Sequence, residues 1–218
     1  MDLITAIKTR RSIRQFKDID VDDDLLKKII ETATWAPSAC NIQGWKFIVV
    51  KDQALKEKIV EKGGSVVIKT APVGILVLYN NQTTNLEYKD YIQSASATIN
   101  TLLLTAHYYG LGGCWICHLP CIKTIRNLFK IPSIFSPIAF VALGYPTSQP
   151  QEVKRKYSVE DVISYNVFDF KVSTEKLSKI KLFGTRLLRK IYLKTPDFIK
   201  KGFLNKIVDK KFVKKFKN

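Results

Sequence analysis

The chain has 218 residues, of which 46% are hydrophobic and 25% charged, and these proportions exclude wholesale disorder, a collagen-like repeat and a disulfide-rich miniprotein. Its 36 Lys and Arg residues outnumber 19 Asp and Glu residues, which leaves a formal net charge of +17. The excess lies at one end, because residues 1–170 hold 20 basic and 16 acidic residues whereas residues 171–218 hold 16 and 3. We therefore expect a domain over residues 1–170 and a separate basic tail over residues 171–218.

The start of the chain and its apolar runs bear on where the protein resides. The sequence becomes polar by Lys8 and lacks the pattern of a signal peptide. Apolar runs such as residues 73–79 and 138–145 are much shorter than the roughly 20 residues that a membrane-spanning helix needs. Four cysteines without an export signal favour free thiols in a reducing compartment. The expectation is a cytoplasmic protein.

Helical and strand patterns alternate along residues 1–170. Apolar side chains at three- and four-residue steps, together with capping residues, predict helices at residues 3–9, 22–36, 54–61, 87–109, 120–129 and 160–163. Apolar and β-branched runs predict strands at residues 45–50, 73–79, 112–116 and 137–145. Short helices interleaved with about four strands are typical of an α+β or α/β domain.

A basic cluster follows the first predicted helix and reads Arg10-Arg11-Ser12-Ile13-Arg14. Guanidinium groups offer bidentate, charge-assisted donors and serine adds a hydroxyl, so the cluster suits a phosphate group. A solvated basic surface is the alternative interpretation of the same residues.

A polar segment runs from Ala36 to Trp45 and contains Pro37, Ser38, Asn41 and Gln43. Asn and Gln both donate and accept hydrogen bonds, which suits the mixed edge of a heterocycle. By itself, a polar loop whose side chains face water is the simpler interpretation of this segment.

A glycine-rich motif reads Gly110-Leu111-Gly112-Gly113-Cys114-Trp115-Ile116-Cys117-His118. Glycines ahead of a short strand let the backbone approach a flat ligand closely. The last five residues also spell a haem-attachment signal, but that chemistry needs an export signal, which this chain lacks. A metal or iron–sulfur set formed with Cys40 and Cys121 is a further alternative, and buried free thiols are the simpler one.

In this order and at this spacing the three motifs resemble the FMN-dependent nitroreductase family. Residues 10–16 match the pattern Arg-Arg-Ser-x-Arg-x-Phe, and residues 36–45 match Ala-Pro-Ser-x-x-Asn-x-Gln-x-Trp. Gly44 stands where the family usually has proline. Residues 110–116 match Gly-Leu-Gly-x-Cys-Trp-Ile, and the exit at residues 143–146 precedes a basic pair and a short acidic helix. The resemblance covers about residues 1–165.

The resemblance implies an α+β fold of nitroreductase type, with a central, mainly antiparallel sheet flanked by helices. It further implies an interlocked homodimer that holds FMN at the interface, here with a helical C-terminal extension. Arg10, Ser12 and Arg14 would hold the phosphate and ribityl chain, with Arg11 nearby. Lys154 and Lys156 would complete the cationic cage around the phosphate. The remaining FMN-binding residues are Pro37, Ser38 and Asn41 from the partner, with Gln43 at the flavin edge, and Trp115, Ile116 and Cys117 beside the reactive part of the ring.

The family chemistry belongs to the cofactor. NAD(P)H as co-substrate reduces the flavin and leaves. A small acceptor of nitroaromatic, quinone-like or related type then binds where the nicotinamide was, which completes a ping-pong cycle. This needs no acid–base side chain, so we expect neither a catalytic residue nor a metal site. The alternative hypothesis is a non-catalytic or biosynthetic flavin-fold protein that its basic tail docks on a membrane or on a partner.

The basic tail, residues 171–218, falls outside the family pattern. Apolar residues at three- and four-residue steps predict two amphipathic helices with lysines on the opposite face. Such helices bind an anionic membrane surface, here the inner membrane face, or dock on a protein partner. Packing on the body of the protein is the alternative. Nucleic acid is not an expected partner, because the Phe residues lie opposite the charges.

Overall fold

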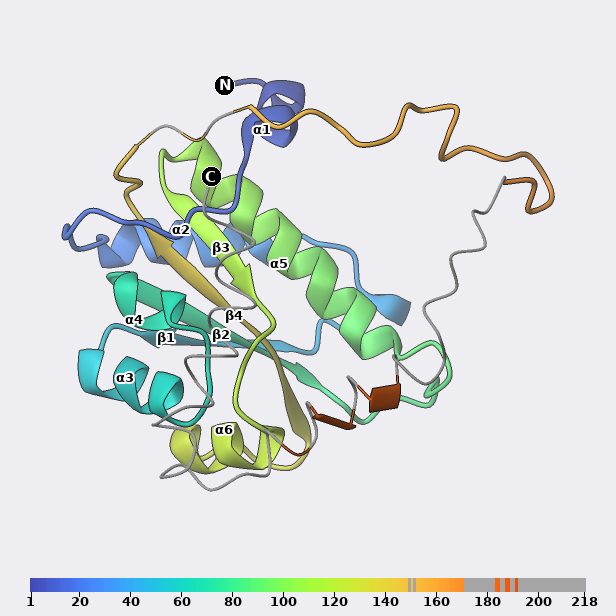
Figure 1. Ribbon diagram of the computed structural model, residues 1–218. Helices are drawn as coiled ribbons and strands as arrows, with labels where there is room; N and C mark the ends of the chain where they lie inside the picture. The colour runs from blue at the N-terminus through green and yellow to red at the C-terminus, as the bar shows by residue number, and fades with distance from the viewer. Residues whose placement is uncertain (149, 151, 171–182, 185–186, 189–190, 192–218) are drawn as a thin grey trace. The chain divides into compact units, whose positions relative to one another are not determined.

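The computed structural model describes residues 1–148, 150, 152–170, 183–184, 187–188 and 191. These residues fall into two compact units, one over Met1–Pro150 and one between Gln151 and Thr195. The first unit contains every helix and strand labelled in Figure 1. The helices predicted for the basic tail lie for the most part outside the described residues, and the domain boundary at residue 170 stays a prediction.

A four-stranded sheet forms the centre of the first unit, with its strands in the order β1, β2, β4, β3. The strands are β1 (Trp45–Val50), β2 (Val73–Asn80), β3 (Gly112–Ile116) and β4 (Phe135–Gly144). All neighbouring strands are antiparallel, with Trp45 opposite Tyr79 and Gly113 opposite Leu143. The structure confirms the predicted α+β fold with its antiparallel sheet, and β4 begins ahead of its predicted start.

The helices of the first unit are α1 (Leu3–Thr9), α2 (Asp23–Ala33), the 3-10 turn η1 (Ala39–Asn41), α3 (Gln53–Glu61), α4 (Val67–Thr70), α5 (Asp90–Tyr108) and α6 (Ile122–Phe129). Local chemistry sets their ends. The Asp22 side chain accepts hydrogen bonds from the backbone N–H groups of Asp24 and Leu25 at the start of α2. Gly110, with a φ of 80°, follows the end of α5.

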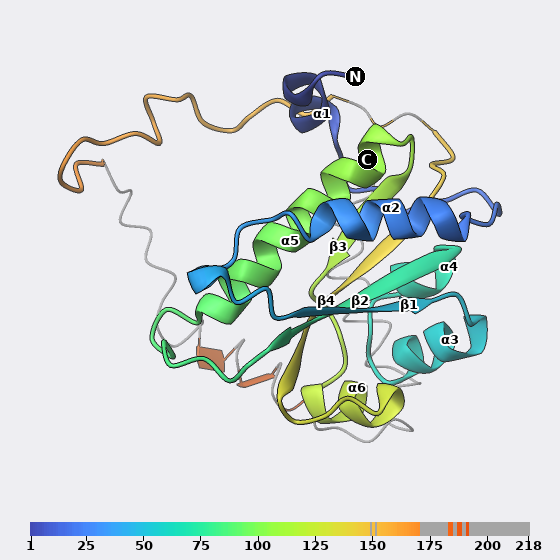
Figure 2. The ribbon, with the colours of Figure 1, turned by 180° about the vertical axis from the view of Figure 1, so that it is seen from behind.

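Helices cover both faces of the sheet, as Figures 1 and 2 show from opposite sides. Helices α2 and α5 pack on one face, where Leu102 and Val141 belong to one buried cluster. Helices α3, α4 and α6 pack on the other face, where Ile59 and Phe140 belong to a second cluster. Successive residues of a strand point to opposite faces. A strand covered on both faces is therefore apolar throughout, as β2 is.

The helix predicted at residues 160–163 does not form. Ser158 N donates to Asp161 Oδ2 at 2.9 Å, as at the start of a helix, but the residues that follow make a turn. The Ser164 hydroxyl binds the carbonyl of Val167 instead. Side-chain hydrogen bonds of this kind compete with the helical backbone pattern, which explains why the acidic segment stops after one turn.

Other element boundaries differ by a few residues from the predicted ones. Helix α6 begins two residues after Pro120, so this proline lies outside the first turn of the helix. Helix α5 begins directly after Lys89, and the backbone of Lys89 is in the left-handed conformation. Helix α4 was not predicted, because four residues are too few for a periodic pattern. Within the part of the chain that the structure describes, no helix has the length and apolar character needed to cross a membrane.

Candidate functional site

A β-bridge joins the arginine segment, residues 10–14, to the edge of the sheet. Ser12 pairs with Gly113 in a parallel bridge, and Ile13 N donates to Gly113 O at 3.0 Å. Strand β3 is an edge strand, and alternate residues of a strand direct their backbone N–H and C=O groups to the same edge. The backbone of Trp115 therefore faces the same edge, beyond the segment. The fold thus brings together two motifs that are far apart in the sequence.

Two glycines of the third motif make room for side chains of the same chain. A Cβ atom at Gly112 would lie 2.6 Å from Ile13 Cγ1, and one at Gly113 would lie 2.5 Å from Leu103 Cδ2. Both distances are shorter than packed atoms tolerate. The structure therefore gives these glycines a packing role, where the sequence suggested close approach to a flat ligand. Gly112 lets the arginine segment lie directly on β3.

A cavity of about 160 Å³ lies beside the arginine segment, and Arg10, Arg11 and His107 contribute to its lining. None of the described residues that line it is acidic. His107 Nε2 lies 2.8 Å from Thr9 Oγ1, a contact that ties the end of α1 to α5. Burial, and then the charges of Arg10 and Arg11, lower the pKa of His107. The arginines therefore supply the positive charge here at neutral pH.

The arginines differ in how the chain holds them. Arg11 Nη1 donates to the carbonyl oxygens of Lys8 at 2.6 Å and of Arg10 at 2.8 Å. Arg14 Nη1 donates to Ser12 O at 3.3 Å, which is a weak hydrogen bond. Arg11 thus shapes the turn after α1, and Arg14 makes a longer bond within its own segment.

The Trp115 side chain lies against the cluster of α2 and α5 and is half-buried. Its indole Nε1 is buried and has no hydrogen-bond partner among the described residues. A buried donor without an acceptor is costly, and a ligand can supply the acceptor. Ile116 is buried on the other face of the sheet, and Cys117 is exposed just after β3.

The polar segment between Pro37 and Gln43 has an unusual backbone. Cys40, Asn41 and Gln43 have φ values of 49°, 54° and 50°, a region that residues other than glycine rarely adopt. Local hydrogen bonds hold this shape: Gln43 N donates to Ser38 Oγ at 3.1 Å, and Gln43 Nε2 donates to Asn41 Oδ1 at 2.7 Å. Such strain clusters at functional sites.

The polar segment and the arginine segment lie near opposite ends of α5. Ala39 N donates to Ser94 Oγ near the start of α5 at 3.0 Å. The arginine segment lies near His107, close to the end of that helix. Thirteen helical residues at a rise of about 1.5 Å separate Ser94 from His107 by about 20 Å. A single chain therefore does not bring the two predicted parts of the site together, as Figure 1 also shows.

The remaining predicted site residues, Lys154 and Lys156, belong to the second unit and are exposed. Lys156 Nζ lies 4.9 Å from the centroid of the Tyr157 ring, and its interaction with this tyrosine raises the pKa of the lysine. Both side chains are thus open to solvent within their own unit.

The four cysteines are free thiols. Cys114 is buried, which raises the pKa of its thiol, whereas Cys40, Cys117 and Cys121 are exposed. Among the described residues, no group of three or more His, Cys, Asp or Glu side chains could hold a metal ion. The prediction of buried free thiols therefore holds for Cys114 and is wrong for the other three cysteines, which are exposed.

The chain belongs to the nitroreductase family, whose model matches residues 7–67 and 61–145. It is 38% identical over 154 residues to a Methanothermobacter thermautotrophicus protein named as a candidate NADH dehydrogenase/NAD(P)H nitroreductase, across 69% of this chain and 80% of the relative. It is 31% identical over 188 residues to an NADH dehydrogenase of Thermus thermophilus, across 68% of this chain and 89% of the relative. These matches confirm the family that the motifs predicted.

A solved structure supports the same assignment. An FMN-dependent nitroreductase from Clostridium difficile superposes with a TM-score of 0.68 and 29% sequence identity. The match covers 76% of this chain and 100% of that one. The α+β fold described above is therefore the fold of this family.

Proposed function

We propose that this protein is an FMN-dependent oxidoreductase that uses NAD(P)H to reduce a small acceptor of nitroaromatic, quinone-like or related type. One observation carries the proposal: an arginine segment, in a cavity whose described lining residues include no acidic side chain, lies on the edge strand of a nitroreductase fold. A phosphate group and a planar heterocycle need this combination of cations and backbone donors.

The chain's residues would divide the work of binding. Arg10, Ser12 and Arg14 would hold the phosphate and ribityl chain, with Arg11 shaping the turn beside them. Lys154 and Lys156 would add positive charge to balance a phosphate of charge near −2. The open edge of β3 at Trp115, with the residues up to Cys117, would supply hydrogen-bond donors to the ring. When bound, FMN supplies the hydride chemistry.

No side chain is required to move a proton in this scheme, and we name no catalytic residue. The residues of the chain position the ring, exclude water from one side of it, and stabilise negative charge through fixed donors. The orphan donor of Trp115 supports this role, because it lacks an acceptor among the described residues. NAD(P)H and the acceptor would bind one after the other at the same open face of the ring.

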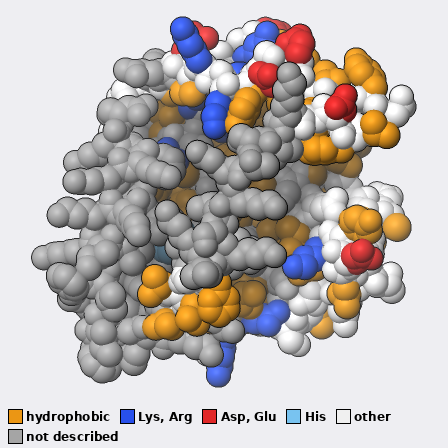
Figure 3. All heavy atoms as spheres, turned by 45° about the vertical axis from the view of Figure 1, so that its right-hand side comes forward, with side chains coloured by type: hydrophobic (Ala, Val, Ile, Leu, Met, Phe, Trp, Pro, Cys, Tyr) orange, Lys and Arg blue, Asp and Glu red, His pale blue; other side chains and the backbone are white. Residues whose placement is uncertain are grey.

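We infer that two copies of the chain form a homodimer and share each site. The supporting observation is the separation of about 20 Å along α5 between the two predicted halves of the site. Pro37, Ser38, Asn41 and Gln43 would then meet the flavin held by the partner's arginine segment. Exposed apolar side chains support such an interface, among them Leu3 at 68% and Trp35 at 83% exposure. Figure 3 shows exposed apolar groups among charged ones on one face.

Purification and a visible spectrum test the function. We expect a yellow protein whose flavin absorbance bleaches when NAD(P)H is added without oxygen and returns when a quinone or a nitroaromatic compound is added. Mass spectrometry of the released cofactor should identify FMN. A colourless protein that does not take up added FMN would favour the non-catalytic alternative.

A second function, docking on an anionic membrane surface, is favoured by the charge of the basic tail. Residues 171–218 hold 16 basic and 3 acidic residues and lie beyond the family match, which ends at residue 145. Among the few described residues of this region, Phe183, Leu188 and Ile191 are exposed by 67%, 67% and 53%. Apolar side chains among cations bind at the interface of anionic bilayers, where each cation contributes about 1 kcal/mol.

Sedimentation with vesicles tests this docking. The full chain should sediment with vesicles that contain phosphatidylserine, remain in solution with neutral vesicles, and be released by high salt. A chain ending at residue 170 should keep its flavin spectrum and lose vesicle binding. Equal sedimentation of the two chains would contradict a membrane role for the tail. Binding to neither type of vesicle would favour a protein partner.

A further inference from the structure

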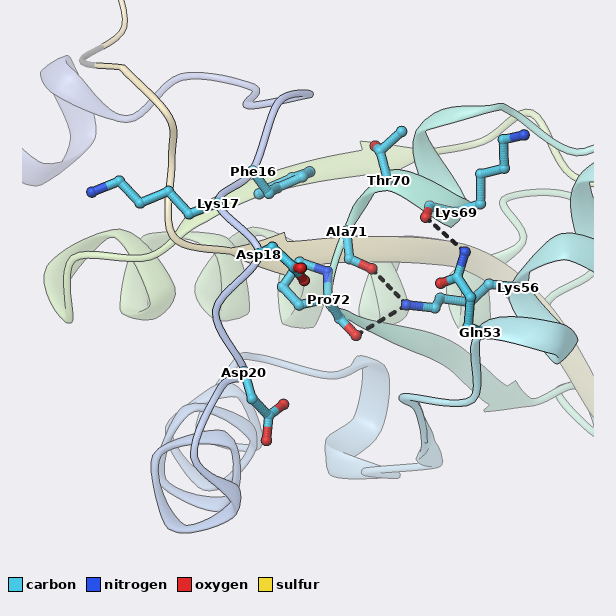
Figure 4. A pocket seen from close by; sticks show the side chains of 10 residues that line it. All are labelled: Phe16, Lys17, Asp18, Asp20, Gln53, Lys56, Lys69, Thr70, Ala71 and Pro72. Carbon is cyan, nitrogen blue, oxygen red and sulfur yellow. Dashed lines mark hydrogen bonds between the residues drawn. The ribbon is translucent and has the colours of Figure 1, made fainter.

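Lys56 of α3 is a buried cation, because the residue is only 2% exposed. Its Nζ donates to Ala71 O at 2.6 Å and to Pro72 O at 3.0 Å, as Figure 4 shows. Among the residues that the structure describes, no carboxylate lies within 4.0 Å of this ammonium group. A buried charge without an ion partner is costly. Two backbone carbonyls offset the cost here, so Lys56 fixes the backbone just before β2.

The ring of Pro72 packs beside Phe16, which follows the arginine segment. A Cβ atom at Gly144, the last residue of β4, would lie 2.7 Å from Pro72 Cγ and 3.0 Å from Phe16 Cδ1. Both rings therefore fill the space that a side chain at Gly144 would take. The backbone of Phe16 also forms an antiparallel bridge with Pro146. Phe16 is thus held between the exit of β4 and the residue that Lys56 fixes, only two residues after Arg14.

A second contact joins the end of α4 to the backbone of Arg14. Thr70 Oγ1 lies 3.4 Å from Arg14 O and 3.0 Å from Val67 O. A hydroxyl has one proton to donate, so the contact with Arg14 is the weaker of the two. Gln53 Nε2 of α3 donates to Lys69 O at 3.2 Å. Helix α3 is therefore bonded at two places to the stretch of chain that contacts the end of the arginine segment.

We infer that Lys56 is a positioning residue for the phosphate of FMN, an inference that rests on the proposed function. Loss of its ammonium group leaves two carbonyls without their donor, so the backbone at Pro72 shifts. Phe16 then loses its packing partner, and the end of the arginine segment moves with it. A charge-assisted contact weakens when its geometry is lost, so Arg14 holds the phosphate less tightly. Lys56 does not touch the flavin in this scheme.

The ratio of FMN affinity to riboflavin affinity tests the inference, because the two flavins differ only in the phosphate group. Fluorescence titration of the full chain with each flavin measures this ratio. Lys56→Met should lower the ratio about tenfold, by weakening FMN binding and leaving riboflavin binding unchanged. Lys58→Met removes an exposed charge from the same helix and should leave the ratio unchanged. A merely structural role for Lys56 would weaken both flavins alike and would not move the ratio.

A thermal melt of each variant separates a change in the site from loss of the fold. If Lys56→Met fails to fold, Pro72→Ala decides, because Pro72 is only half-buried and the change removes the ring that packs beside Phe16. Pro72→Ala should lower the ratio in the same direction. An unchanged ratio in the folded variants would overturn the inference and leave the proposed function standing. A wild-type chain that binds neither flavin would overturn both.

Discussion

The missing side chain of Gly112 determines where the whole arginine segment lies. A methyl group at this residue would lie 2.6 Å from Ile13 Cγ1, too close for either atom to remain where it is. Gly112→Ala should therefore lower the free energy of unfolding by about 1–3 kcal/mol, as other overpacked sites do. Urea denaturation measures the change.

A double variant provides the control for Gly112→Ala. Ile13→Ala removes Cγ1 and Cγ2, two of the three atoms that the new methyl group meets, and keeps Cβ at 2.8 Å. The loss in the double variant should then be smaller than the sum of the two single losses. Strict additivity of the two losses would contradict the packing explanation of Gly112.

Glycine variants of the strained residues Cys40 and Asn41 distinguish an effect on stability from an effect on FMN binding. Left-handed backbone costs residues other than glycine about 1–2 kcal/mol, so a glycine at either residue should relieve strain. We expect Cys40→Gly to raise the free energy of unfolding by about 1 kcal/mol without changing FMN affinity. Asn41→Gly should raise the free energy of unfolding by less, because Gln43 Nε2 loses its acceptor. The same variant should weaken FMN binding about tenfold.

Fluorescence titration with FMN and urea denaturation measure the two effects in parallel. Cys40→Gly is the matched control, because it makes the same backbone change at the neighbouring residue. A fall in FMN affinity as large for Cys40→Gly as for Asn41→Gly would assign the effect to backbone shape rather than to the amide of Asn41.

At the scale of elements, His107 couples α1 to α5 and makes their contact sensitive to pH. Burial and the neighbouring arginines lower its pKa below the ordinary value of 6.5, so the unfolded chain binds the proton more readily than the folded one. The free energy of unfolding therefore rises with pH between the lowered pKa and 6.5, and this contribution is lost as the pH falls.

His107→Gln keeps a polar group toward Thr9 but cannot titrate. We expect the stability of the variant relative to the wild type to be higher at about pH 5 than at about pH 7.5. Urea denaturation at the two pH values measures this difference. The same difference at both values would show that folding leaves the pKa of His107 unchanged, and would contradict its lowering by burial and the arginines.

The elements also show what sequence patterns can and cannot predict. The apolar run of β2 and the spacing of Leu26 and Ile29 in α2 are local signals, and the predicted elements formed there. The helix at residues 160–163 failed because Ser164 offered competing hydrogen bonds. The pairing of Thr9 with His107 left no sequence signal, because 98 residues separate them.

In the candidate site, too, local motifs could be predicted from the sequence and long-range contacts could not. The motifs at residues 10–16 and 110–116 identified the family, and the bridge between Ser12 and Gly113 brings them together. The packing role of Gly112 depends on which side chain crosses it, which no local pattern encodes. The strain at Cys40 likewise appears only in the backbone.

At the scale of the whole molecule, the proposed dimer makes a prediction about mixed subunits. A chain with Arg10→Ala and Arg14→Ala lacks one half of the site, and a chain with Asn41→Glu lacks the other. If two subunits share each site, coexpression of the two chains should restore FMN to about a quarter of the sites, because half of the dimers are mixed and each has one intact site. Absorbance per chain measures the occupancy. No restoration would favour sites built within one chain.

The most direct measurement of the central claim is the FMN occupancy of the Arg10→Ala, Arg14→Ala variant. Each lost charge-assisted contact to the phosphate costs about 1.5–3 kcal/mol, so the two together should weaken binding about 100-fold or more. The matched control, Lys27→Ala with Lys28→Ala on α2, removes the same charge elsewhere and should keep the flavin. We expect a folded, colourless arginine variant beside a yellow control. A folded arginine variant that retains FMN at the wild-type level would contradict that claim.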